Sequence, residues 1–148
     1  MRLTPAQRFF SKEEQNKIVE AIQQAEKDTS AEIRVHIENF CFTDPVRRAQ
    51  KIFIKHGMHR TENRNAVLFY FAILNKKLAI IGDQGIHEKV GSAFWEGLVK
   101  ELIEALKANI NKAEVLCACI MKVGHVLSTY FPPSSTNPNE LSNNISFE

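Results

Sequence analysis

The sequence contains no long apolar stretch. Its first 15 residues, MRLTPAQRFFSKEEQ, are too polar for a signal peptide, and no later segment stays apolar over the length that a bilayer requires. We therefore expect a protein without a membrane span that is located in the cytoplasm. The three cysteines, a small and odd number, fit a reducing compartment in which disulfides are rare.

The sequence also lacks a large excess of either charge. The formal net charge is +2 over 148 residues, and basic residues such as Arg47, Arg48 and Lys51 stand beside acidic neighbours in a helical pattern. We interpret these cations as a solvated helix face and expect neither nucleic-acid binding nor binding to a membrane surface. The length and the hydrophobic share of 44% predict one globular domain with a single core.

Motifs that identify common catalytic sites are absent. There is no P-loop, Gly-x-Gly-x-x-Gly fingerprint, Gly-x-Ser-x-Gly elbow, HExxH helix or EF-hand loop. Cys41 and Arg47 have the spacing that cysteine-dependent phosphatases use to surround a phosphate. Here the intervening loop has no glycine to turn its amides inward, and Asp44 would put a carboxylate where the phosphate must bind. We therefore reject a cysteine phosphatase.

Helix caps and apolar periodicity predict the first half of the fold. Ser11 and Glu14 form a capping box that begins a helix ending near Asp28. Residues 32–38 alternate between apolar and polar side chains, which is typical of a strand with one face on the core and one face that is at least partly wet. We expect four polar residues on the wet face and interpret the histidine among them as a surface residue: Glu32, Arg34, His36 and Glu38.

The second half begins with a helix that starts at Asp44-Pro45 and stops near Gly57. The unbroken apolar run 66–73 predicts a central strand, and a turn at 75–77 leads into a third strand, 78–81. Two helices follow. One has an apolar stripe that includes Trp95, which we interpret as core, and the other starts with a capping-box-like pair, Asn111 and Glu114, and ends at Pro132-Pro133.

The resulting order, α-β-α-β-β-α-α, predicts an α/β domain with helices on a small mixed sheet. The first two strands should form a right-handed parallel unit, and the hairpin adds an antiparallel strand. We assign residues 1–131 to a single domain and residues 132–148 to a polar, flexible C-terminal tail. Three apolar residues of this tail could contact the surface: Leu141, Ile145 and Phe147.

This topology brings three segments to one rim of the sheet. The starts of the two parallel strands and the end of the third strand lie on the same side, so residues 30–32, 56–65 and 82–87 should be neighbours. Titratable groups converge there, which makes the rim the expected site. These groups are Glu32, His56, His59, Glu62, Arg64, Asp83 and His87.

The stretch Gly82-Asp83-Gln84-Gly85 leaves three interpretations open. It is first a chain reversal, since this composition is common in turns. Its amides could instead bind an anion, or the rim could bind a divalent cation, with candidate ligands His59, Glu62, Asp83 and His87. We take as the ligand-binding rim Glu32, Arg64, Asn65, Gly82, Asp83 and Gly85.

Several segments together resemble the TPM domain, a family named after a thylakoid-lumen phosphatase, a photosystem II repair protein and a modulator of acetylcholine receptors. The resemblance covers roughly residues 10–130. It rests on F-S-K-E-E-Q before the first helix, T-S-A-E-I-R-V before the first strand, and R-N-A-V-L-F-Y-F-A-I-L-N-K-K-L-A-I-I-G-D-Q-G-I-H at the hairpin. It implies a three-layer α/β/α sandwich with a small mixed sheet.

The resemblance also implies candidate functions. Some members of the family have been described as acid phosphatases, and calcium binding has been associated with the domain; others act in repair or modulate membrane partners. Gly82 and Gly85 loosely match the family's Gly-x-Gly turn, and His87 stands near its usual acidic residue. Arg64-Asn65-Ala66 replaces a frequent Asp-Asn-Gly, so a cation stands in place of a calcium ligand.

These observations favour a binding module that recognises a protein partner, a small anion or a metal at the rim. The alternative is a metal-dependent, acid phosphatase-like hydrolase in which Asp83 is the candidate catalytic residue. There, Asp83, Glu62 and the neighbouring histidines would hold calcium, magnesium or zinc to activate water, and Arg64 would bind the phosphate. A third hypothesis is a structural subunit that docks through its tail.

Overall fold

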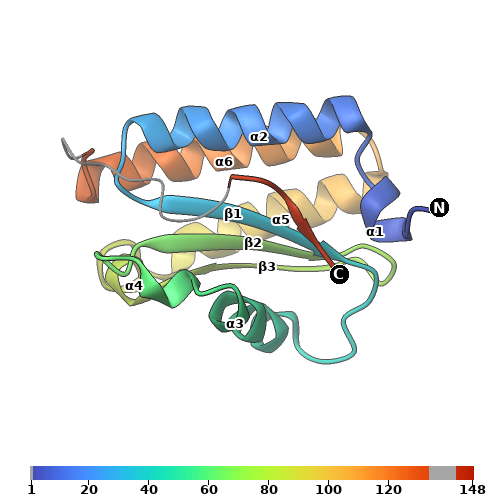
Figure 1. Ribbon diagram of the computed structural model, residues 1–148, viewed down its shortest axis with the longest axis horizontal. Helices are drawn as coiled ribbons and strands as arrows, with labels where there is room; N and C mark the ends of the chain where they lie inside the picture. The colour runs from blue at the N-terminus through green and yellow to red at the C-terminus, as the bar shows by residue number, and fades with distance from the viewer. Residues whose placement is uncertain (1, 134–142) are drawn as a thin grey trace.

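A four-stranded mixed sheet forms the centre of the molecule in the computed structural model, which describes residues 2–133 and 143–148 (Figure 1). The strand order is β3-β2-β1-β4. As predicted, β1 runs parallel to β2 and β2 runs antiparallel to β3. The elements are α1 (Pro5–Arg8), α2 (Lys12–Lys27), β1 (Glu32–Glu38), α3 (Pro45–Lys55), η1 (Met58–Arg60), β2 (Ala66–Ala72), β3 (Lys77–Gly82), α4 (Gln84–Val90), α5 (Ser92–Ala108), α6 (Lys112–Tyr130) and β4 (Ser146–Phe147).

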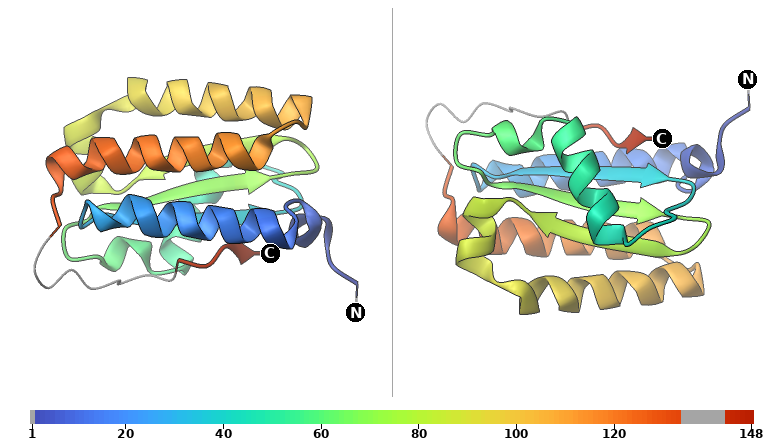
Figure 2. Two further views of the ribbon diagram at one scale, coloured as in Figure 1. Left: turned by 90° about the horizontal axis from the view of Figure 1, so that it is seen from above. Right: turned by 90° about the horizontal axis from the view of Figure 1, so that it is seen from below.

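Helices cover both faces of this sheet, which confirms the α/β/α sandwich. Helices α2, α5 and α6 lie on one face, and α3 crosses the other (Figures 1 and 2). On the first side, Val35 and Phe69 belong to a large apolar cluster with all three helices. On the second side, Leu68 packs in a smaller cluster with Ile52 and Phe53 of α3. In the described part of the chain, no helix is both long and apolar enough to cross a bilayer.

Most predicted helix ends are confirmed. The Ser11 hydroxyl accepts a hydrogen bond from the Glu14 amide at 3.0 Å, and the Glu14 carboxylate accepts one from the Ser11 amide at 2.8 Å. Gly57, with φ of +69°, has the left-handed conformation expected after α3. The capping box at Asn111 is wrong, because Asn111 itself is left-handed (φ 55°) and its side chain makes no capping bond.

The C-terminal segment contributes a strand that the sequence did not predict. Ser146 and Phe147 run parallel to β1, opposite His36 and Ile37. Ile145 and Phe147 are partly buried against the large apolar cluster. Leu141, the third apolar residue proposed to contact the surface, lies outside the described residues, as does the rest of 134–142.

Candidate functional site

Polar side chains are buried along β1 on the side of α3. Glu32, His36 and Glu38 are buried and Arg34 alone is half-buried, so the prediction of a surface histidine was wrong and the face is largely covered. Helix α3 covers this side of β2 and β3, while the C-terminal segment lies beside β1. Alternation shows that two faces of a strand differ, but it does not show that a distant segment covers the polar one.

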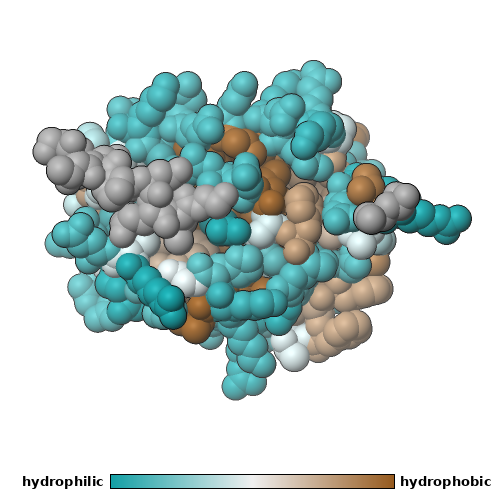
Figure 3. All heavy atoms as spheres, viewed as in Figure 1, coloured by the Kyte–Doolittle hydropathy of each residue, from teal (hydrophilic) through white to brown (hydrophobic). Residues whose placement is uncertain are grey.

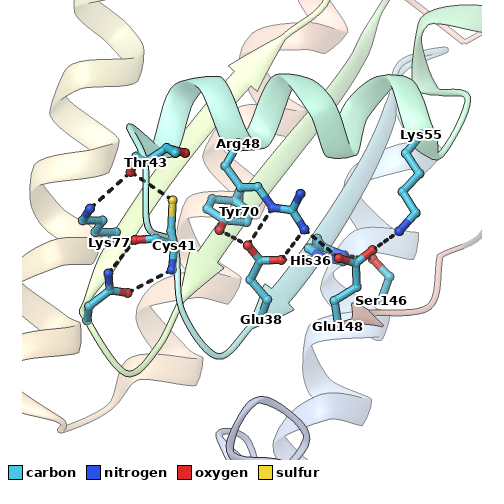
Figure 4. A network of polar contacts seen from close by, with 11 residues as sticks. His36, Glu38, Cys41, Thr43, Arg48, Lys55, Tyr70, Lys77, Ser146 and Glu148 are labelled. Atoms are coloured by element: carbon cyan, nitrogen blue, oxygen red, sulfur yellow. Dashed lines mark hydrogen bonds and ion pairs between the residues drawn. The ribbon is translucent and has the colours of Figure 1, made fainter.

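Glu38 is at the centre of a network at the end of β1 (Figure 4). Arg48 of α3 donates to both of its carboxylate oxygens, each at 2.9 Å, and the Tyr70 hydroxyl of β2 donates a third hydrogen bond. Only 7% of the Glu38 side chain is exposed. Burial opposes its ionisation, but the bonds from Arg48 and Tyr70 outweigh burial and lower the pKa of the carboxyl. Glu38 is therefore ionised, and its carboxylate accepts three hydrogen bonds that connect β1 to α3 and β2.

Arg48 also links Glu38 to a second carboxylate from the C-terminal segment. Its Nη2 donates to Glu148 Oε2 at 2.7 Å, and Lys55 Nζ donates to Glu148 Oε1 at 2.5 Å. The bond from Lys55 is the main reason why the pKa of Glu148 is lowered. The Glu148 amide donates to the Ile37 carbonyl at 3.1 Å. One carboxylate is thus held by two cations while its backbone is bonded to the edge of β1.

His36 stands beneath this pair of carboxylates and is fully buried. Its Nδ1 lies 2.7 Å from Ser146 Oγ, and that hydroxyl can donate to the Val35 carbonyl at 3.4 Å. If it does, Nδ1 carries the proton and Nε2 keeps its lone pair. Nε2 has no hydrogen-bond partner among the described residues and lies 3.8 Å from Glu38 Oε2. Burial lowers the pKa of His36 to about 4, so the ring is neutral at pH 7.

This geometry permits two kinds of ligand. The ligand atoms of His36, Glu38 and Glu148 lie within 4.8 Å of one another, the single such group in the part of the chain that the structure describes. Imidazole nitrogen and carboxylate oxygen suit a divalent cation such as zinc. A cation would, however, have to displace Arg48 from both carboxylates. The existing contacts are those of a carboxylate-binding site, beside a hollow of about 530 Å³ that Lys51 also lines.

The three segments of the predicted rim lie beside one another in the structure. The Glu32 amide donates to the Asn65 carbonyl at 3.4 Å, and Asn65 Nδ2 donates to Ser30 Oγ at 3.2 Å. The Gly85 amide donates to the Arg64 carbonyl at 2.9 Å. The topology therefore correctly brought the three segments together.

The stretch Gly82–Gly85 does not form a separate turn, because Asp83 is the N-cap of α4, which starts at Gln84 directly after β3. One Asp83 oxygen accepts from the Gln84 amide at 2.8 Å, and Arg64 donates to both oxygens at 2.7 and 2.8 Å. Gly85 allows close packing, since a Cβ there would lie 2.5 Å from the Asn63 carbonyl oxygen. Arg64, which the hydrolase hypothesis assigned to a phosphate, thus donates to Asp83 through two nitrogens.

The four candidate metal ligands of the rim do not form a converging group within the described residues. Asp83 is buried beneath Arg64, whereas Glu62 and His87 are exposed and His59 is half-buried. Cys41, part of the rejected phosphatase spacing, is buried, and its thiol donates to the Thr43 carbonyl at 3.2 Å.

Sequence reasoning missed Glu38, Arg48 and Glu148 as a site. One indication was available: a charged row on a strand that pairs in parallel with a fully apolar strand. Parallel strands are ordinarily covered on both faces, so their charged side chains need buried partners. The identity of the partner Glu148 could not be deduced, because it lies 110 positions from Glu38 and no pattern connects the two.

Comparisons with known proteins agree with this fold. The TPM domain matches residues 4–124. The chain is similar to the NMR structure of the BA42 protein from the psychrophilic bacterium Bizionia argentinensis, with 38% identity, a TM-score of 0.85 and coverage of 95% of this chain and 96% of that one. The N-terminal domain of cg2496 from Corynebacterium glutamicum shares the fold at 19% identity and a TM-score of 0.62, over 84% of this chain and 78% of that one.

No curated protein sequence matches the chain. The family match extends from α1 into α6 and includes the parallel strands, the hairpin and the helices on both faces. Together with the 38% identity to BA42 over nearly the whole of both chains, it shows that the chain belongs to the TPM domain family.

Proposed function

We propose that this TPM domain is a binding module that recognises an extended, acidic segment of a protein partner. The observation that carries the proposal is the position of Glu148, whose carboxylate contacts Arg48 and Lys55 while its amide bonds to Ile37 of β1. Addition of a strand to a sheet edge gives affinity through the backbone, and charged side chains give specificity.

The contacts of residues 146–148 describe the ligand that such a site would take. A hydroxyl stands opposite His36, a large apolar side chain packs on the core next to it, and a carboxylate follows. A partner segment with this order of side chains would compete with the chain's own segment. The binding site would then stay occupied by the chain's own segment until a partner displaces residues 146–148.

The test uses the full chain with Glu148→Lys, which places a third cation beside Arg48 and Lys55 and should release the segment. The peptide Asn-Ile-Ser-Phe-Glu is titrated into this variant and followed by backbone NMR. We expect saturable shifts at residues 35–38 and a Kd at least about tenfold weaker when the peptide's glutamate is replaced by glutamine. Equal affinity for both peptides, or no shift in β1, would reject the proposal.

A divalent cation is the second candidate ligand, because His36, Glu38 and Glu148 converge. The hydrolase alternative needs such a cation, either here or at the predicted rim ligands His59, Glu62, Asp83 and His87. Titration with calcium, magnesium, manganese and zinc distinguishes these sites by the residues whose NMR signals shift. Metal-dependent phosphatase turnover that is lost in Asp83→Asn would support a catalytic metal site at the rim. If none of the four cations produces saturable shifts, the hydrolase hypothesis is excluded.

We also infer a cytoplasmic location. Cys41, Cys117 and Cys119 are all free thiols in this structure, which supports a reducing compartment. Mass spectrometry of the chain purified from cells with thiols trapped should find all three alkylated. A disulfide between two copies would contradict this location.

A further inference from the structure

The loop between β1 and α3 exposes two phenylalanines. Phe40 is 46% exposed and Phe42 is 87% exposed, and their rings stack with centroids 5.4 Å apart. Val46 and Ile54 of α3 are also exposed. An apolar patch appears at the lower right of Figure 3, over this loop. Large apolar side chains gathered on a polar surface indicate an interaction site.

The same surface carries cations that have no ion-pair partner among the described residues. Helix α3 has four basic residues and no acidic one. Arg48 and Lys55 are paired with Glu38 and Glu148. Within the described residues, Arg47 and Lys51 make no ion pair, and Lys77 Nζ donates only to the Thr43 carbonyl. Asp44 is the acidic residue exposed on the loop.

The aromatic and basic residues form one continuous surface. Thr43 and Lys51 line a hollow with Phe40 and Phe42, and they also line a second hollow with Arg47 and Ile54. Lys51 therefore stands between the phenylalanines and the outer side of α3. We call this surface the α3 face and define it as Phe40, Phe42, Arg47, Lys51 and Ile54.

We propose that the α3 face binds the surface of an anionic lipid membrane. In this arrangement the two phenylalanine rings enter the headgroup region, while Arg47 and Lys51 contact lipid phosphates and carboxylates. Aromatic side chains favour the membrane interface, and nearby basic residues are attracted to anionic lipids. The net charge of +2 does not reveal this surface, because the attraction depends on the local charge within a Debye length.

The exposure of Phe42 favours a membrane over an acidic protein segment. Side chains that form a peptide-binding groove are ordinarily well buried by their neighbours, whereas Phe42 is 87% exposed although it lines a hollow. The carboxylate-binding site at Arg48 and Lys55 adjoins the α3 face, because Arg48 lines the first of the same two hollows and Lys55 the second, but it is occupied by Glu148. The proposal therefore goes beyond the partner-binding function and does not depend on it.

The test is co-sedimentation of the full chain with vesicles. We compare phosphatidylcholine vesicles with vesicles that also contain phosphatidylserine, at low and at high salt. We expect binding only to the anionic vesicles, with loss of binding as salt rises. Phe42→Ser should weaken this binding at least about fivefold, because it removes the exposed ring. The double variant Arg47→Glu/Lys51→Glu should abolish it.

The matched control is Lys100→Glu/Lys107→Glu on α5, which makes the same change in net charge on the other side of the sheet. It should bind as the unaltered chain does. NMR spectra of all variants check that they remain folded. Three results would each overturn the proposal: no binding to anionic vesicles, equal losses in both double variants, or release by polyglutamate together with no effect of Phe42→Ser. The last would indicate an acidic protein ligand instead.

Discussion

At each end of the parallel strands, an arginine donates hydrogen bonds from two nitrogens to one carboxylate. Arg64 holds Asp83 at the rim, and Arg48 holds Glu38 at the opposite end. The other bonds differ. Asp83 accepts one more bond from the next residue of its own helix, whereas Glu38 accepts one from β2 and Arg48 continues to the C-terminal segment. A bidentate pair is therefore a local helix cap at one end and a link between four segments at the other.

Isosteric loss of each carboxylate charge gives the largest expected difference between the ends. Glu38→Gln should lower the free energy of unfolding by about 2 to 3 kcal/mol, because Arg48 and Tyr70 lose a buried charged acceptor. Asp83→Asn should cost less than half as much, since the side chain of Arg64 is 46% exposed and water can solvate it. Urea unfolding measures both values. Equal losses would show that the ends do not differ as described.

Two glycine substitutions test whether the backbone at Gly85 packs tightly against the neighbouring loop of the rim. Gly85→Ala should destabilise the protein by about 2 kcal/mol, because the new Cβ would meet the Asn63 and Arg64 carbonyl oxygens at 2.5 and 2.7 Å. Gly97→Ala is the matched control, since it lies within α5 with no atom inside 4 Å. It should stabilise the protein by about 0.5 to 1 kcal/mol. A neutral Gly85→Ala would mean that the loop at Arg64 can move freely.

Alkaline pH should affect the rim end. Glu26 of α2 accepts a hydrogen bond from the Ile33 amide at 2.8 Å. Burial, with a further contribution from Glu32, raises its pKa to about 8 from an ordinary value of 4.5. The associated stability is complete below pH 4.5 and is lost as pH rises through 8. We expect about 1 to 2 kcal/mol of loss between pH 6.5 and 8, measured by urea unfolding. Glu26→Gln should flatten this slope; an unchanged slope would contradict the assignment.

Acid pH should affect the opposite end by a smaller amount. The pKa of His36 is lowered to about 4 by burial, from an ordinary value of 6.5. Its contribution to stability is present above pH 6.5 and is lost as pH falls toward 4, with about 1 kcal/mol of the loss between pH 6.5 and 5.5. NMR titration of the imidazole carbons should show no protonation of His36 above about pH 5. A midpoint near 6.5 would show that the ring is solvated.

The sequence predicted the framework because its determinants are local or topological. The capping box at Ser11, the alternation of β1 and the hairpin each lie within a few residues. The direction of the strands then placed Arg64 beside Asp83. Topology could not show that these two side chains would form an ion pair with each other. Nor could it show that Asp83 would cap a helix and not bind a ligand.

The network at Glu38 depends on information that no local pattern contains. β4 is two residues long, so it has no periodicity to detect, and its partner strand lies more than 100 positions earlier. The burial of His36 follows from that distant pairing, and so does the position of Glu148 between Arg48 and Lys55. The sequence likewise identified Arg47, Arg48 and Lys51 as cations of this helix, but it could not show which of them would be neutralised.

The outer edge of β1 has a consequence for self-association. An uncovered strand edge is a template for other strands, and β4 covers only part of this one. The remaining backbone groups are used in another way: Glu26 accepts from the Ile33 amide, Ser146 donates to the Val35 carbonyl and Glu148 donates to the Ile37 carbonyl. The contacts of Glu26 and of the C-terminal segment thus occupy backbone groups of β1 to which a strand of a second copy could otherwise bond.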